Sequence, residues 1–68
     1  METLFVGKIV HFVMPDGTHR PAIVVNVYDG NNADLQVFDA ENGILWQPSA
    51  YRFDTPTPYT WHWIEPVQ

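Results

Sequence analysis

An all-β fold is the class that this sequence predicts, and two observations carry the prediction. No stretch long enough for a helix keeps its apolar residues at helical spacing without a proline or glycine interrupting it. Val, Ile and aromatic residues occur instead in short runs, which clusters of Pro, Gly, Asp and Asn separate. Short apolar runs between turn clusters are typical of all-β domains. We therefore expect strands and no helix.

Five runs are expected to form the strands. In chain order they are Lys8 to Met14, Ala22 to Tyr28, Leu35 to Phe38, Ile44 to Gln47 and Thr60 to Ile64. Within each run, successive residues fall on opposite faces, as they do in a half-buried strand. The tetrapeptides that follow the first three runs are rich in turn-forming residues: PDGT, DGNN and AENG.

The segment between the fourth and fifth runs is expected to be irregular. It reads PSAYRFDTPTPYT. Pro48, Pro56 and Pro58 exclude a regular central strand across it, because proline has no N–H to give to a neighbouring strand. Tyr51 and Phe53 are expected to anchor this segment on the rest of the domain.

The chain is small for a stable fold. Its 68 residues make one domain, residues 1–68, and such a domain hides only about 60% of the surface that the unfolded chain exposes. Cysteine is absent, so no disulfide supports it. A dense aromatic core, association with copies of itself, or both must supply the stability. Five short strands favour a small SH3-like barrel, because closure removes exposed sheet edges; an OB-like barrel is the second choice.

The charge balance limits the partners. Three Lys and Arg residues against eight Asp and Glu residues give a net charge of −5. This argues against long nucleic acids and anionic membrane surfaces, which bind through clustered cations. A small anion held by one or two arginines is compatible with it. No basic segment precedes an apolar stretch, and no apolar run approaches the length of a membrane span, so we expect a soluble cytoplasmic protein.

Catalytic motifs are not found in the sequence. There is no cysteine nucleophile, no Gly-x-Ser-x-Gly elbow around the single serine, and no glycine-rich phosphate loop. Most of the carboxylates either lie in or beside turns or are expected on a solvated acidic face. We therefore expect no enzyme, no catalytic residues and no cofactor.

The histidines are the only soft metal ligands in the chain. His11, His19 and His62 form no His-x-His or His-x-x-x-His pair, which is the spacing of a local site. They are able to meet in space from separate parts of the fold, and a three-histidine site stays open on that ground. Half-buried, hydrogen-bonded histidines are the more common outcome, so no metal site is predicted.

The tryptophans near the C-terminus are expected to exceed the room in the core. Trp61 and Trp63 share one face of the last run, and His62 points the other way. The interior of so small a barrel cannot hold both indoles together with Phe12, Phe38 and Trp46. At least one of the two tryptophans is therefore expected at a ligand pocket or a subunit interface, where Trp is enriched.

The few cations are candidates for ligand binding. Only Lys8, Arg20 and Arg52 are present, and Arg52 lies between Tyr51 and Phe53. An arginine beside aromatic rings is able to stack on a base or to bind a phosphate with two hydrogen bonds. The competing interpretation is a surface ion pair with one of the surplus carboxylates, which contributes about 0–1 kcal/mol.

Several motifs together carry a family resemblance. They are VGKIVHFVMPDGTHRPAIVVNVYD, LQVFDAENG, Trp46 with Ser49 and Tyr51, and TWHW. Taken together they resemble a family of small proteins of tailed bacteriophages and prophages, most of which carry no assigned activity. The sequence departs from the family pattern at Asp34, Tyr59 and Ile64. The resemblance covers nearly the whole chain and implies a phage origin and an SH3-like barrel.

The leading hypothesis follows from this resemblance and from the residues above. It is a non-enzymatic anti-defence protein that oligomerises in the host cytoplasm and sequesters a small nucleotide signal of host immunity. The predicted ligand-binding residues are His19, Arg20, Tyr51, Arg52, Trp61, His62 and Trp63. In this hypothesis the arginines hold phosphates, one tryptophan stacks on a base, and one histidine donates a hydrogen bond.

Two alternatives remain open. The first is an inhibitor or nucleic-acid mimic that docks on a basic surface of a host protein through Asp29, Asp34, Asp39, Glu41 and Asp54. The second is a minor component of the virion or of its assembly.

Overall fold

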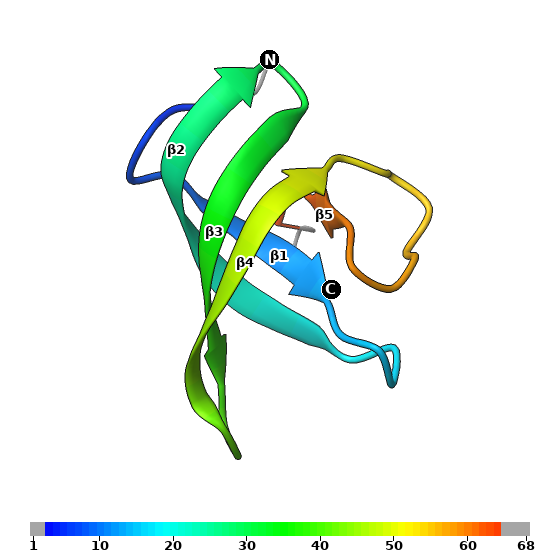
Figure 1. The fold of residues 1–68 in the computed structure, drawn as a ribbon. Coiled ribbons are helices and arrows are strands. Elements are labelled where there is room, and N and C mark those ends of the chain that lie inside the picture. The colour runs from blue at the N-terminus through cyan, green and yellow to red at the C-terminus, as the bar shows by residue number, and fades with distance from the viewer. Residues whose placement is uncertain (1–2, 65–68) are drawn as a thin grey trace.

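The computed structural model describes residues 3–64 as a single five-stranded antiparallel sheet (Figure 1). Its strands are β1 (Ile9–Val13), β2 (His19–Asp29), β3 (Asn32–Asp39), β4 (Gly43–Tyr51) and β5 (Trp61–His62). The structure contains no helix between residues 3 and 64, so no membrane-spanning helix is found in that range. The predicted all-β class is confirmed.

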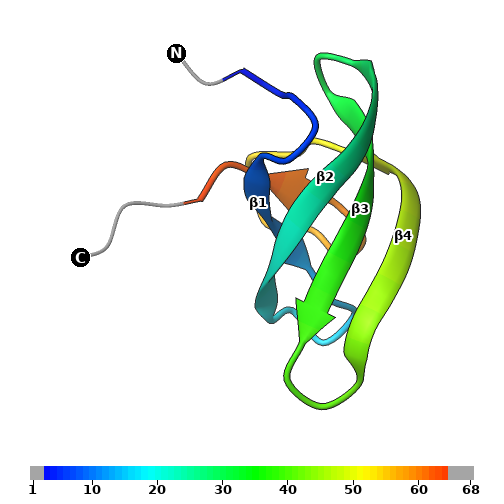
Figure 2. The ribbon, with the colours of Figure 1, turned by 90° about the vertical axis from the view of Figure 1, so that its left-hand side faces the viewer.

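The strands follow the order β4-β3-β2-β1-β5 in the sheet. The long strand β2 pairs with β1 through its first half and with β3 from Ala22 onward, so it belongs to both halves of the sheet. Figure 2 shows how strongly the sheet curls. The curl brings the end of β4 to β5, where Arg52 and Trp61 form a parallel bridge and the Phe53 N–H donates to the Trp61 carbonyl at 2.9 Å. The sheet is barrel-like, and this short contact does not close it fully.

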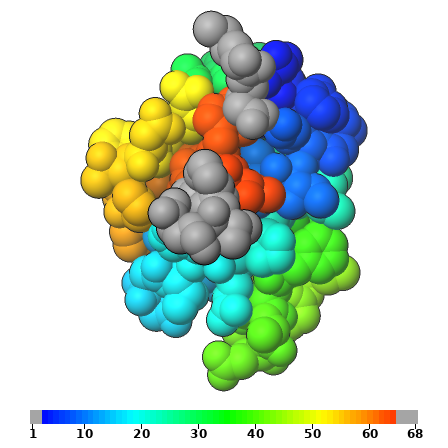
Figure 3. Space-filling view, turned by 180° about the vertical axis from the view of Figure 1, so that it is seen from behind, coloured from blue at the N-terminus to red at the C-terminus, as the bar shows by residue number. Residues whose placement is uncertain are grey.

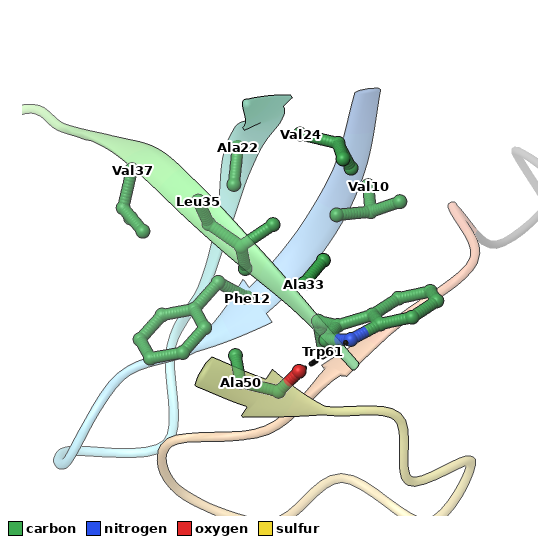
Figure 4. Close-up of a cluster of buried hydrophobic side chains, with 9 residues drawn as sticks. All are labelled: Val10, Phe12, Ala22, Val24, Ala33, Leu35, Val37, Ala50 and Trp61. Atoms are coloured by element: carbon green, nitrogen blue, oxygen red, sulfur yellow. Dashed lines mark hydrogen bonds between the residues drawn. The ribbon is translucent and has the colours of Figure 1, made fainter. Parts of the chain in front are cut away.

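The core fills the inside of the curl. Its buried apolar residues are Val10, Phe12, Ala22, Val24, Ala33, Leu35, Val37, Ala50 and Trp61 (Figure 4). Trp61 is the largest of them, and its indole Nε1 donates a hydrogen bond to the Ala50 carbonyl at 3.0 Å. Ala33 and Ala50 face each other across β3 and β4 and make room for the indole. Burying an indole of about 150–250 Å² contributes at most about 4–6 kcal/mol.

The aromatic residues divide between this core and the surface. Phe12 and Trp61 are buried, whereas Phe38 and Trp46 are 38% and 54% exposed. The expectation that the interior cannot hold every large ring agrees with this arrangement.

Strand β2 begins earlier than predicted, at His19 instead of Ala22. Pro21 is therefore inside the strand, opposite His11 of β1. The pairing of β2 with β3 starts only at Ala22, so on that side Pro21 has no neighbouring strand that requires an N–H.

Strand β4 also extends beyond its predicted end, Gln47, and reaches Tyr51. Pro48 does not stop it, because β4 is an edge strand and has a partner on one side only. The pairs Leu35–Gln47 and Ala33–Ala50 leave two residues, Pro48 and Ser49, opposite the single residue Asp34. This bulge bends the edge strand toward β5.

The segment after β4 is held by its backbone, and the predicted aromatic anchors are wrong. Tyr51 and Phe53 are 59% and 51% exposed. The Arg52 N–H instead donates to the Asn31 carbonyl at 2.8 Å, next to the bond from Phe53 to β5. Within the segment, the Thr60 hydroxyl donates to the Thr57 carbonyl at 2.6 Å.

Strand β5 is shorter than the predicted run Thr60 to Ile64 and contains only Trp61 and His62. Tyr59 has a φ of 68°, which takes the chain out of extended geometry just before it. The Tyr59 N–H donates to the Val13 carbonyl, and the Val13 N–H donates to the Thr60 carbonyl. These two hydrogen bonds hold the residues just before β5 against β1.

Candidate functional site

The two tryptophans of the last run differ in burial. Trp61 is fully buried in the core, while Trp63 is half-buried and packs against it with ring centroids 5.0 Å apart. The rings are inclined at 78°, so this edge-to-face contact occupies only part of the Trp63 ring. Trp63 is thus the one of the two that a ligand is able to reach. Trp61 does not fit the predicted role of a ligand-binding residue, because it is enclosed in the core.

Two of the three cations gather around Trp63. The Lys8 ammonium nitrogen lies 5.7 Å from the centroid of the Trp63 ring, and the guanidinium carbon of Arg52 lies 6.0 Å from it. The same ammonium lies 5.5 Å from the centroid of Phe5. We call these four residues, Phe5, Lys8, Arg52 and Trp63, the Trp63 patch. In a chain with net charge −5, it is a local concentration of positive charge on aromatic surface.

The local backbone explains why these residues meet. A tight turn brings Phe5 beside Lys8, with the Lys8 N–H donating to the Phe5 carbonyl at 3.1 Å, and Gly7 supplies the positive φ of 97° that the turn needs. The Gly7 N–H and the Lys8 carbonyl both bond to Val24, which fixes the turn against β2. From behind, the orange-red end of the chain lies between the blue N-terminal residues and the yellow segment after β4 (Figure 3).

Arg52 is only weakly engaged elsewhere. Its Nε lies 3.6 Å from a carboxylate oxygen of Asp54, whose side chain is 74% exposed. An exposed ion pair of this length contributes little, so a ligand anion is able to compete with Asp54 for the guanidinium. Tyr51 precedes Arg52 in the extended chain, so its exposed ring falls on the other side of the strand. The structure does not bring Tyr51 into the Trp63 patch.

Arg20 is placed in different surroundings. It lies opposite Phe12 on the core face of the sheet, and its Nε forms an ion pair with the buried carboxylate of Asp39 at 3.0 Å. The adjoining pocket of about 230 Å³ is also lined by Asp16 and Glu41. Three carboxylates around one guanidinium disfavour an anionic ligand there.

Arg20 and Arg52 are therefore not partners in one site. Between them along the sheet stand Phe12 and Trp61, which pair with each other. Three inter-strand steps of about 4.8 Å separate the two arginine backbones along the sheet. The structure gives Arg52 and Trp63 a common site and leaves Arg20 outside it.

The histidines converge on the face of the sheet opposite the core. His11 lies directly across from His62 of β5, and on its other side it faces Pro21 of β2. His19 is two residues from Pro21 and so projects on the same face. The ring centroids of His11 are 5.7 Å from His62 and 6.0 Å from His19, and those of His19 and His62 are 4.8 Å apart. We call these three residues the three-histidine cluster.

The three-histidine cluster spans the whole range of exposure. His62 is buried at 5%, His11 is half-buried and His19 is exposed. His62 is thus more enclosed than the facing-out or half-buried position expected for it. Two of the predicted ligand-binding residues, His19 and His62, thus meet with His11. They lie on the opposite face of the sheet from Arg20 and Trp61.

Sequence reasoning missed two members of the Trp63 patch, Phe5 and Lys8, which were not among the predicted ligand-binding residues. The sequence left open whether the three histidines meet, and the register of β1 with β2, which places Val13 opposite His19, brings His11 and His19 to one face. No signal in the sequence connected Phe5 to Trp63, because they lie near opposite ends of the chain.

Two of the five carboxylates that were expected to form an acidic docking face are buried. Asp34 and Asp39 are 4% and 8% exposed, so they are structural carboxylates rather than docking residues. Asp39 accepts hydrogen bonds from Asn42 in the turn after β3 and pairs with Arg20. Asp29, Glu41 and Asp54 remain exposed.

No protein-family model, no curated protein and no solved structure matches this chain.

Proposed function

We propose that this protein is a non-enzymatic binding protein that captures a small anionic ligand carrying an aromatic base, at the Trp63 patch. The observation that supports the proposal is the placement of two of the three cations, Lys8 and Arg52, within about 6 Å of one half-exposed indole. Nucleotides combine the two chemistries that such a patch offers, a base that stacks and a phosphate that accepts charge-assisted hydrogen bonds.

The biological setting of the proposal comes from the sequence motifs. Their resemblance to proteins of tailed phages favours a role against host immunity, in which the chain sequesters a nucleotide signal in the infected cell. Sequestration requires binding without turnover, and it is helped by several sites in one assembly. The exposed apolar residues Ile44 and Trp46 on the edge strand β4 support self-association, because an exposed edge of this kind is a surface on which copies meet.

Calorimetry tests the proposed ligand class. The full chain is titrated with a panel of cyclic and linear oligonucleotide signals at low salt, and saturable heat with at least one member is expected. Arg52→Ala and Trp63→Ala are each expected to weaken that binding at least tenfold, which is about 1.4 kcal/mol.

The matched control is Phe38→Ala, which removes an exposed ring. Phe38 lies at the far end of β3, whereas Asn32, at the other end, pairs with Tyr51, next to Arg52 of the Trp63 patch. Its affinity should equal that of the unaltered chain. Absence of heat with every member of the panel contradicts the proposal, and so does equal weakening by all three substitutions.

Docking on a basic host protein through an acidic face has less support. Two of its five carboxylates, Asp34 and Asp39, are buried. A pull-down from host lysate at low and high salt separates the two proposals, since docking through the exposed Asp29, Glu41 and Asp54 must weaken as salt rises.

A further inference from the structure

We propose that the three-histidine cluster binds one divalent transition-metal ion, of the kind of Zn²⁺, through one imidazole nitrogen each of His11, His19 and His62. The site lies on the opposite face of the sheet from the core. It involves none of the residues of the Trp63 patch, and it does not depend on the proposed nucleotide binding.

The backbone of the site is organised before any ion binds. His11 is on β1, which is paired on one side with β2 and on the other with β5. The three histidines therefore come from three adjacent, hydrogen-bonded strands and not from loops. Sites built on strands hold their ligands more precisely than sites on loops, so little ordering of the chain is needed on binding.

The distances fit a metal site that tightens on binding. One nitrogen from each ring can be chosen so that all three lie within 4.8 Å of one another. Zn²⁺ binds imidazole nitrogen at about 2.0–2.1 Å, which in a tetrahedral site puts the nitrogens about 3.3 Å apart. The remaining difference of about 1.5 Å or less is within reach of side-chain rotation, because the second torsion of histidine has a broad energy well.

The ligand set selects the kind of ion. Imidazole suits Zn²⁺, Cu²⁺, Ni²⁺ and Co²⁺, whereas Mg²⁺ and Ca²⁺ require oxygen ligands. The ligand group found among residues 3–64 consists of histidines. Transition-metal ions are thus favoured over the hard divalent cations.

Residues 3–64 supply three ligands, and a tetrahedral ion has a fourth position beyond them. His19 is exposed, so this position faces solvent on the β2 side, while His62 encloses the ion on the β5 side. Neutral imidazoles carry no charge, so an oxygen ligand, from water or from an anion, suits the fourth position of the ion. The net charge of −5 on the chain further favours a cation.

Titration of the full chain with metal alone tests the site. After removal of adventitious metal by a chelator, Zn²⁺ is expected to bind with a stoichiometry of one per chain. Co²⁺ is expected to give the visible absorption of a tetrahedral site, which one equivalent of Zn²⁺ abolishes. At a Zn²⁺ concentration 100 times Kd, the Tm should rise on the order of 10 °C.

His19→Gln is the decisive variant, because His19 is exposed and its replacement leaves the core untouched. We expect it to weaken Zn²⁺ binding at least tenfold and, at the same Zn²⁺ concentration, to reduce the rise in Tm to about half or less. Glu41→Gln is the matched control at the carboxylate-lined pocket near Arg20, and its Zn²⁺ affinity should be unaltered.

A spectroscopic measurement on the unaltered chain removes any dependence on variants that fail to fold. The imidazole nitrogen resonances of His11, His19 and His62 should all shift together on addition of one equivalent of Zn²⁺. A shift confined to one or two of them overturns the proposal. Zn²⁺ binding that survives His19→Gln, or that is lost in Glu41→Gln, also overturns it.

Discussion

Asp34 is a buried carboxylate that accepts hydrogen bonds from residues of two neighbouring strands. Its Oδ2 accepts hydrogen bonds from the Tyr28 hydroxyl at 2.6 Å and the Asn26 amide at 3.3 Å, and its Oδ1 accepts one from the Ser49 N–H at 2.8 Å. These donors, Tyr28 first, lower the pKa of Asp34 below its ordinary value of 3.8. The same contact raises the pKa of Tyr28 above 10.0, since it favours the protonated phenol. Asp34 thus ties β2, β3 and β4 together.

The pKa of Asp34 predicts a dependence of stability on pH. Because the pKa is lower in the folded than in the unfolded chain, the unfolded state binds the proton more tightly. The stabilisation is complete above the unfolded pKa, which is near 3.8, and is lost as the pH falls through the lower folded value. Asp34→Ala should lower the Tm at pH 7 and flatten the fall in Tm between about pH 5 and pH 3.

Thermal unfolding followed by circular dichroism over this pH range measures both effects. Asp54→Ala is the control, because its carboxylate is exposed. An Asp34→Ala variant whose Tm falls as steeply with acid as that of the unaltered chain would show that another group causes the dependence.

Strand β4 owes its path to a single bulge. Ser49 adopts a φ of 51° there, and its N–H turns toward Asp34 instead of toward the sheet ladder. The bend brings Ala50 to the indole of Trp61 and Arg52 to the Trp63 patch. The bulge is therefore a structural precondition of the proposed ligand site.

Substitutions at Ser49 test this role of the bulge. Glycine accepts positive φ without steric cost, so Ser49→Gly should leave stability unchanged or raise it by up to about 1 kcal/mol. A β-branched side chain is strained at this φ, and Ser49→Val should lower the free energy of unfolding by about 1–2 kcal/mol. Urea denaturation of the two variants measures the difference, and equal stability of both would contradict the role assigned to the bulge.

Strand β1 contributes side chains to both faces of the sheet. Val10 and Phe12 point into the core, while His11 between them belongs to the three-histidine cluster. Because successive residues of a strand project on opposite faces, one short strand supports the core and carries a candidate metal ligand.

At the scale of the whole molecule, the outer surface of the edge strand β4 is unusually apolar. Ile44 and Trp46 are 62% and 54% exposed, and a groove of about 190 Å³ lined by Trp46, Leu45 and Tyr59 adjoins them. A small domain without disulfides gains stability from association, so this surface is the expected contact between copies of the chain.

Trp46→Lys should shift the assembly toward the monomer, because it places a strongly hydrated charge in that contact. Light scattering coupled to size-exclusion chromatography measures the mass in solution. The control is Val25→Lys, which introduces the same charge at an exposed position of β2. A monomeric unaltered chain, or an equal effect of both substitutions, contradicts this assignment.

Much of the fold was predictable from local properties. The all-β class, the turns near Gly17 and Gly43, and the opposite directions of Trp61 and His62 follow from turn chemistry and from the period of a strand. The ends of β2 and β4 were not predictable in this way. Whether proline interrupts a strand depends on the presence of a neighbour beside it, as Pro21 and Pro48 show.

The sequence by itself determined which side chains share a face, because alternation along a strand is a local property. It also determined that the aromatic residues exceed the room in the core. Only the tertiary structure decided that Trp61 is buried and Trp63 accessible, that Lys8 and Arg52 meet at one indole, and that three separated histidines converge. Those contacts depend on the pairing of β1 with both β2 and β5 and on the bend of β4, which join parts of the chain that have no local signal in common.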